Sequence, residues 1–158
     1  NRDENFSINL SVDDIKDLET VDFILKTIKE TNTSSRVTFE ILESEGIENY
    51  QEVISFINQI KSLGARIAID DFGTGYSNFE HLLRLDVDYI KIDGSLIKNI
   101  VTDDKHRLNV ETIVSFAKRI GIKTVAEFVS DEKILQTIKE IGISCAQGYH
   151  IGKPETLV

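Results

Sequence analysis

Residues 65–77 read Ala-Arg-Ile-Ala-Ile-Asp-Asp-Phe-Gly-Thr-Gly-Tyr-Ser, and the rest of the chain repeats the pattern that this stretch begins. A short apolar run ends at two adjacent acidic residues, Asp70 and Asp71, and a loop with two glycines follows. Short apolar runs bounded by turn signals are typical of buried strands. We therefore expect a strand over residues 65–71, then a loop, then a helix that begins at about Ser77.

The same kind of run occurs five more times, and helical patterns separate the runs. The further expected strands are residues 6–11, 36–43, 89–93, 123–129 and 145–151. Between them the apolar period changes from two to about 3.6, as in Val53, Ile54, Ile57 and Ile60, which share one helical face. Six strands that alternate with helices predict an α/β fold with a parallel sheet.

The length of the repeated unit bounds the architecture but does not decide it. From Asn9 to Gln147 the chain advances about 28 residues per unit. A (β/α)8 barrel averages ~31 residues per unit, and a doubly wound open sheet has units of similar length. One proline and no Gly- or Ser-rich stretch give no sign of a linker, so residues 1–158 are expected to form one region without an internal boundary.

Composition excludes several classes of protein. The formal net charge of −9 disfavours broad contact with DNA or RNA. No apolar run approaches the ~18 residues that a membrane span needs, so no membrane contact is expected from this segment. Its one cysteine, Cys145, cannot form an internal disulfide, which agrees with a cytoplasmic location. The chain begins at Asn1 and contains no Met, so we expect it to be a piece of a longer protein, which could itself be membrane-anchored.

Polar side chains stand at or near the ends of nearly all the expected strands. They are Asn9, Glu40, Glu43, Asp70, Asp71, Lys91, Asp93, Glu127 and Gln147. The carboxyl ends of parallel strands gather on one face, where the sites of such folds lie. Carboxylates brought together repel one another, so we expect Lys91 and a divalent cation to compensate them. An all-oxygen donor set suits Mg²⁺, Mn²⁺ or Ca²⁺, whereas the scattered His81, His106 and His150 lack metal-ligand spacing.

These residues also resemble those of a known family. Residues 70–77 resemble the Asp-Asp-Phe-Gly-x-Gly-x-Ser loop of EAL domains, bacterial phosphodiesterases that hydrolyse cyclic di-GMP. Five further segments are similar in order and spacing. They are Asn9-Leu10-Ser11, Glu40-Ile41-Leu42-Glu43-Ser44, Lys91-Ile92-Asp93, Ala126-Glu127, and Gln147-Gly148-Tyr149 with Lys153-Pro154.

The resemblance implies a (β/α)8 TIM-type barrel, of which this chain supplies about six βα units, the third to eighth strands. The chain is then the C-terminal two-thirds of a single domain, and the Glu-Ala-Leu segment lies outside it. It also implies metal-dependent hydrolysis of cyclic di-GMP to the linear dinucleotide in bacterial signalling. A two-metal site with Mg²⁺ or Mn²⁺ is expected, with inhibition by Ca²⁺.

Roles for individual residues follow from the same resemblance. Metal ligands are Asn9, Glu40, Asp70 and Asp71, and the catalytic set is Glu127, Lys91 and Asp71. Substrate binding or loop support is assigned to Gln147, Glu43, Asp93, Gly73, Gly75 and Ser77. Implied partners are cyclic di-GMP, a second copy of the chain in a homodimer, and an upstream sensor or GGDEF-type (diguanylate cyclase) domain.

Three positions depart from the family pattern. Phe128 stands where the family has Gly, Ser130 replaces the second Glu of Ala-Glu-Gly-Val-Glu, and Gly94 occurs where Arg is common. The departures at Phe128 and Ser130 slightly favour an alternative, a catalytically inactive EAL domain that serves as a cyclic di-GMP receptor or a protein-interaction regulator. The presence of the acidic residues and Lys91 favours the enzyme more strongly. An unrelated Mg²⁺-dependent barrel enzyme is a third alternative.

Overall fold

The computed structural model describes residues 4–42, 50–73 and 79–156. The strands are β1 (Phe6–Leu10), β2 (Val37–Leu42), β3 (Arg66–Phe72), β4 (Tyr89–Ile92), β5 (Lys123–Ala126) and β6 (Cys145–Ala146). The helices are α1 (Val12–Lys16), α2 (Leu18–Thr31), η1 (Ser34–Arg36), α3 (Tyr50–Ser62), α4 (Phe79–Arg84), α5 (Gly94–Lys98), α6 (Asp104–Ile120) and α7 (Glu132–Ile141).

The chain divides into two compact units. The first comprises Asn1–Asp70 with Asn78–Asp88, and the second Asp71–Ser77 with Tyr89–Val158.

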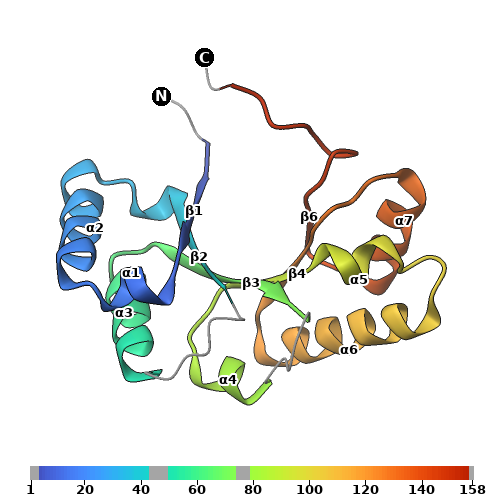
Figure 1. The fold of residues 1–158 in the computed structure, drawn as a ribbon, viewed down its shortest axis with the longest axis horizontal. Helices are drawn as coiled ribbons and strands as arrows, with labels where there is room; N and C mark the ends of the chain where they lie inside the picture. The colour runs from blue at the N-terminus through green and yellow to red at the C-terminus, as the bar shows by residue number, and fades with distance from the viewer. Residues whose placement is uncertain (1–3, 43–49, 74–78, 157–158) are drawn as a thin grey trace. The chain divides into compact units, whose positions relative to one another are not determined.

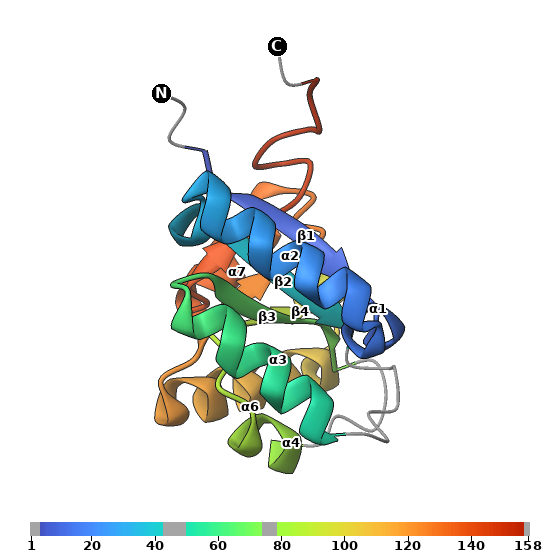
Figure 2. The same cartoon turned by 90° about the vertical axis from the view of Figure 1, so that its left-hand side faces the viewer.

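The first unit is a parallel sheet with its helices on one side. β1 pairs with β2 and β2 with β3, in register pairs such as Asn9 with Glu40. Figure 1 and Figure 2 show α2 and α3 on the same side of these strands. The core between them includes Ile41, Ile60 and Ile67, each with 0% of its surface exposed. Burying such a side chain stabilises the fold by about 1.5–3 kcal/mol.

The second unit repeats this construction. β4 pairs with β5 and β5 with β6, again in parallel. The carboxyl end of β3 also belongs here, because the Asp93 N–H donates to the Phe72 carbonyl at 3.2 Å. Figure 1 shows α5, α6 and α7 beside these strands. The α6–β5 connection is short because Gly121 ends the helix in the left-handed conformation (φ 79°).

Strand order within each unit agrees with both architectures that unit length left open. In each unit the strands follow chain order and run parallel, with helices between them. A doubly wound sheet keeps chain order within each half and reverses it only at the switch point between the halves, whereas a (β/α) barrel does not reverse it. The fold is therefore of the α/β class, with parallel strands joined through helices. Within the described ranges, no helix combines the length and apolar character that crossing a membrane requires.

Most expected elements are confirmed, but the last strand and some connections differ. β6 covers only two residues, so the expectation of a strand through residue 151 was wrong. The chain turns after Ala146, where the N–H groups of Ile151 and Gly152 both donate to the Gly148 carbonyl. β5 likewise ends at Ala126 rather than at 129. The short helices α1 and α5 were not expected.

Asp88 joins a helix to a strand in the first unit. Its carboxylate accepts hydrogen bonds from Lys61 Nζ and from the Ile67 N–H, both at 2.9 Å. Asp86 also pairs with Lys61 at 2.9 Å, but its side chain is 68% exposed. Burial lowers the pKa of Lys61, but its hydrogen bonds to Asp88 and Asp86 outweigh this effect and keep the pKa above its usual 10.5.

We predict that Asp88→Ala lowers the free energy of unfolding by about 1–3 kcal/mol, because it leaves a strand N–H without its acceptor. Asp86→Ala is the matched control. It removes the more exposed member of the same ion pair network and should cost less than about 1 kcal/mol. Urea unfolding of the intact protein measures both values, and equal losses would contradict the assignment.

Candidate functional site

In the first unit, the predicted site residues stand near strand ends. Asn9 on β1 lies opposite Glu40 on β2, and Asp70 on β3 lies opposite Leu42. Glu40 is buried, with 9% of its surface exposed, whereas Asn9 is exposed. A buried carboxylate needs a partner that compensates its charge, and a bound metal ion is one such partner. The remaining predicted residues Glu43, Gly75 and Ser77 lie outside the described residues.

In the second unit, Lys91 and Glu127 form a buried ion pair. Lys91 Nζ lies 3.0 Å from Glu127 Oε1, and the side chains are only 8% and 10% exposed. The pairing follows from the sheet, because Lys91 on β4 lies beside Val125 and Glu127 comes just after the end of β5. The Glu127 N–H continues the ladder by donating to the Ile92 carbonyl at 3.3 Å.

Asp71 adds a second carboxylate to this pair. One oxygen of Asp71 and one of Glu127 lie within 4.8 Å of each other, in a group that could hold a metal ion. Asp71 has a left-handed backbone (φ 55°), which is rare for a residue other than glycine. Asp70 is its neighbour on the same strand. The donor set is all carboxylate and partly buried, so it fits a hard divalent cation such as Mg²⁺ or Mn²⁺.

Asp93 and Gly73 support the ends of the strands. The Asp93 carboxylate accepts a hydrogen bond from the Ser95 N–H at 2.8 Å and so caps α5. Gly73 has φ 106°, and a Cβ there would lie 2.6 Å from Leu96 Cδ1. The backbone conformation therefore favours glycine at the start of the loop, and any larger residue would also displace the Leu96 side chain.

Gln147 lies on a pocket beside Glu127. Its N–H donates to the Ala126 carbonyl at 2.8 Å, and its carbonyl accepts from the Val129 N–H at 3.0 Å. The pocket has a volume of about 420 Å³, and Lys98, Phe128 and Tyr149 also line it. Sequence reasoning did not assign these three residues to the site. Phe128 directly follows Glu127 and Tyr149 lies two residues after Gln147, and this closeness in sequence was the available signal.

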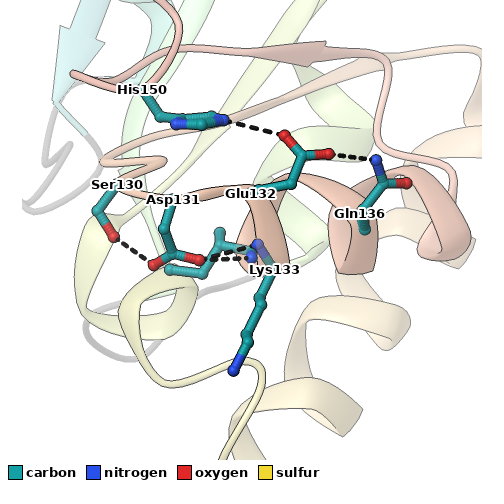
Figure 3. Close-up of polar contacts among 7 residues, drawn as sticks. Ser130, Asp131, Glu132, Lys133, Gln136 and His150 are labelled. Carbon is teal, nitrogen blue, oxygen red and sulfur yellow. Dashed lines mark hydrogen bonds and ion pairs between the residues drawn. The ribbon is translucent and has the colours of Figure 1, made fainter.

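A network of polar contacts holds the segments that border this pocket (Figure 3). Asp131 accepts from the N–H groups of Lys133 and Ile134 and so caps α7. The next residue, Glu132, contacts His150 Nε2 at 3.1 Å and also accepts from Gln136. These contacts lower the pKa of Glu132 below its ordinary value of 4.5, the hydrogen bond from Gln136 being the larger cause and the one from His150 the next. They tie the turn after β6 to the start of α7.

Comparisons with known proteins identify the family. The model of the EAL domain matches residues 1–154, and the chain belongs to the EAL domain family. It is 38% identical over 157 residues to cyclic di-GMP phosphodiesterase PdeB of Shewanella oneidensis, covering 99% of this chain and 18% of that protein. It is 33% identical to cyclic di-GMP phosphodiesterase PdeA of Borreliella burgdorferi, covering 96% of this chain and 23% of that protein.

Solved structures agree with this assignment. The PaMucR phosphodiesterase in complex with c-di-GMP has a TM-score of 0.87 and 29% identity, covering 95% of this chain and 61% of that one. The EAL domain of Mycobacterium smegmatis DcpA has a TM-score of 0.88 and 30% identity, covering 95% and 68%. The predicted barrel class is thereby confirmed. The chain spans about a fifth of the length of the curated relatives named above.

We predict that Lys91→Met and Glu127→Leu each lower the free energy of unfolding by about 3–5 kcal/mol, because each removes the partner that lies 3.0 Å from a buried charge. The double variant should cost less than either single variant. Denaturant unfolding of all four proteins gives the coupling energy. Additive losses would show that the pair is not coupled.

A second prediction concerns the pH dependence of Glu132. Since its pKa is lowered in the folded protein, its contribution to stability is complete above pH 4.5 and is lost as the pH falls through the lower, folded-state pKa. Glu132→Gln should therefore be less stable than the parent protein at pH 7, and the difference should shrink in acid. A difference that stays constant from neutral to acidic pH would contradict this assignment.

Proposed function

We propose that this chain is the C-terminal two-thirds of one EAL phosphodiesterase domain, which hydrolyses cyclic di-GMP to the linear dinucleotide. The observation that carries the proposal is the buried Lys91–Glu127 pair with the Asp71 carboxylate within reach of Glu127. Its relatives support the choice of substrate, because the curated proteins named above are cyclic di-GMP phosphodiesterases and PaMucR was solved with c-di-GMP.

The acidic residues are proposed to hold the metal ions of the reaction. Asn9, Glu40, Asp70 and Asp71 are the proposed ligands, and Mg²⁺ or Mn²⁺ the proposed ions, with Ca²⁺ as an inhibitor. When bound, such ions neutralise the phosphodiester and make water a stronger nucleophile at neutral pH. They also explain how a chain of net charge −9 accepts an anionic substrate.

The remaining side chains have roles that follow from their positions. Glu127 lies 3.0 Å from Lys91 Nζ, and as a carboxylate it can accept a proton from the attacking water. Lys91 orients that carboxylate and stabilises negative charge on the phosphate oxygens. Gln147 lies on the same pocket as Glu127, where its amide can hold water or substrate by hydrogen bonds.

A receptor without activity is the second candidate. The observation that favours it is Phe128, a non-glycine residue with φ 53° directly after Glu127. A strained residue beside a catalytic group can alter the position of that group. In either case we propose a homodimer in the cytoplasm, with a sensor or GGDEF-type domain upstream in the whole protein. The curated relatives are several times longer than this chain, which leaves room for such domains.

We predict that Asp70→Asn in the full-length protein reduces Mg²⁺- or Mn²⁺-dependent hydrolysis of cyclic di-GMP by orders of magnitude, because a proposed ligand is lost. Asp86→Asn is the matched control and should retain activity, since Asp86 is an exposed residue that pairs with Lys61. Chromatographic separation of the linear product measures both rates.

Two outcomes would contradict different parts of this proposal. More than about a tenth of the parent rate in Asp70→Asn at saturating metal would remove Asp70 from the site. A parent protein that binds cyclic di-GMP without hydrolysing it would instead support the receptor.

A further inference from the structure

At two positions of the second unit, the backbone conformation does not explain the residue that is present. Phe128 has φ 53°, a left-handed conformation that favours glycine. Gly94 is the first residue of α5, and its φ lies outside the left-handed region, so its backbone accepts any residue with a Cβ. Local conformation therefore explains neither residue.

Contact between the two residues explains the glycine. A Cβ at Gly94 would lie 2.2 Å from Cδ2 and 2.6 Å from Cγ of Phe128. Both distances are far shorter than a van der Waals contact, so the ring occupies the place of a side chain at position 94. The ring can lie against α5 only because Gly94 has no side chain.

Lys98 holds the ring from the same helix face. Lys98 lies four residues after Gly94, one turn along α5, and its Nζ is 4.3 Å from the centroid of the Phe128 ring. This distance allows a cation–π interaction. Even with both contacts, 56% of the Phe128 surface stays exposed. The helix thus fixes the ring without burying it.

The exposed part of the ring lines the pocket that also contains Glu127 and Gln147. The volume of about 420 Å³ lies within the range of small-molecule pockets, ~300–1,000 Å³. Tyr149, 71% exposed, adds a second aromatic side chain to the lining, and Lys98 adds a positive charge. An aromatic, partly cationic pocket beside a carboxylate–lysine pair suits a planar ring attached to a phosphodiester.

We propose that the Phe128 ring, held by Gly94 and Lys98, is a stacking platform for one purine base of the bound dinucleotide. The inference rests on the proposed function and assigns a binding role to a residue that the hydrolytic mechanism does not use. A base stacked there lies next to Glu127, so the platform positions the sugar-phosphate for attack. This role explains why phenylalanine stands at a position whose backbone conformation favours glycine, because glycine has no ring that could stack against a base.

The test separates binding from folding through Phe128→Gly in the full-length protein. This variant removes the ring and relieves the left-handed strain, so its melting temperature should not fall. Its affinity for cyclic di-GMP should fall about tenfold, as expected for loss of one base–aromatic contact. Calorimetric titration with Ca²⁺ in place of Mg²⁺ measures binding without turnover. Phe23→Gly, at a 69% exposed ring on α2, is the control and should leave affinity unchanged.

Two further variants separate the effect of the aromatic ring from other effects of substitution at position 128. Phe128→Trp keeps an aromatic face and should retain affinity, whereas Gly94→Ala displaces the ring and should lose affinity like Phe128→Gly.

The outcomes distinguish the platform from the proposed function. Unchanged affinity in Phe128→Gly, or loss of affinity in Phe128→Trp, overturns the platform while hydrolysis stands. A parent protein that does not bind cyclic di-GMP overturns both.

Discussion

The buried pairing of Lys91 with Glu127 is the constraint on which the site of the second unit depends. Two charged side chains, each at most 10% exposed, are tolerated in an apolar setting only when they compensate one another. Their separation of 3.0 Å is set by strand geometry, since β4 and β5 run parallel in a register that places Ile92 beside Ala126. The sheet therefore positions both groups before any ligand binds, which is the preorganisation that catalysis requires.

Much of the fold was predictable because its signals are local. Apolar runs at 6–11, 36–43 and 65–71 became β1, β2 and β3 with shifts of a residue or two at their ends. The strand expected at 145–151 failed because apolar character does not determine where a chain turns. The turn needs glycine at position 148, because a Cβ there would lie 2.3 Å from the Val129 backbone nitrogen. That contact joins residues far apart in sequence and leaves no local pattern.

The site was predictable in part, for a related reason. Polar residues at strand ends, such as Asp71 and Glu127, could be found because they interrupt apolar runs. Their pairing with particular partners depends on register, which periodicity alone does not specify. The left-handed backbone of Phe128 was equally hidden, because phenylalanine is an improbable residue for that conformation. Sequence reasoning therefore treated Gly94 and Phe128 as separate departures, whereas the structure shows one contact between them.

The contact between Gly94 and Phe128 also restricts the order in which the two residues could have arisen. Starting from a side chain at position 94 and glycine at position 128, a change to phenylalanine first would place the ring where the older side chain stands. A change to glycine at position 94 first creates only open space at the start of a helix, at a cost of about 0.5–1 kcal/mol. Of the two orders, only the one that changes position 94 first avoids this clash. Restoring a side chain at position 94 is likewise obstructed while the Phe128 ring is in place.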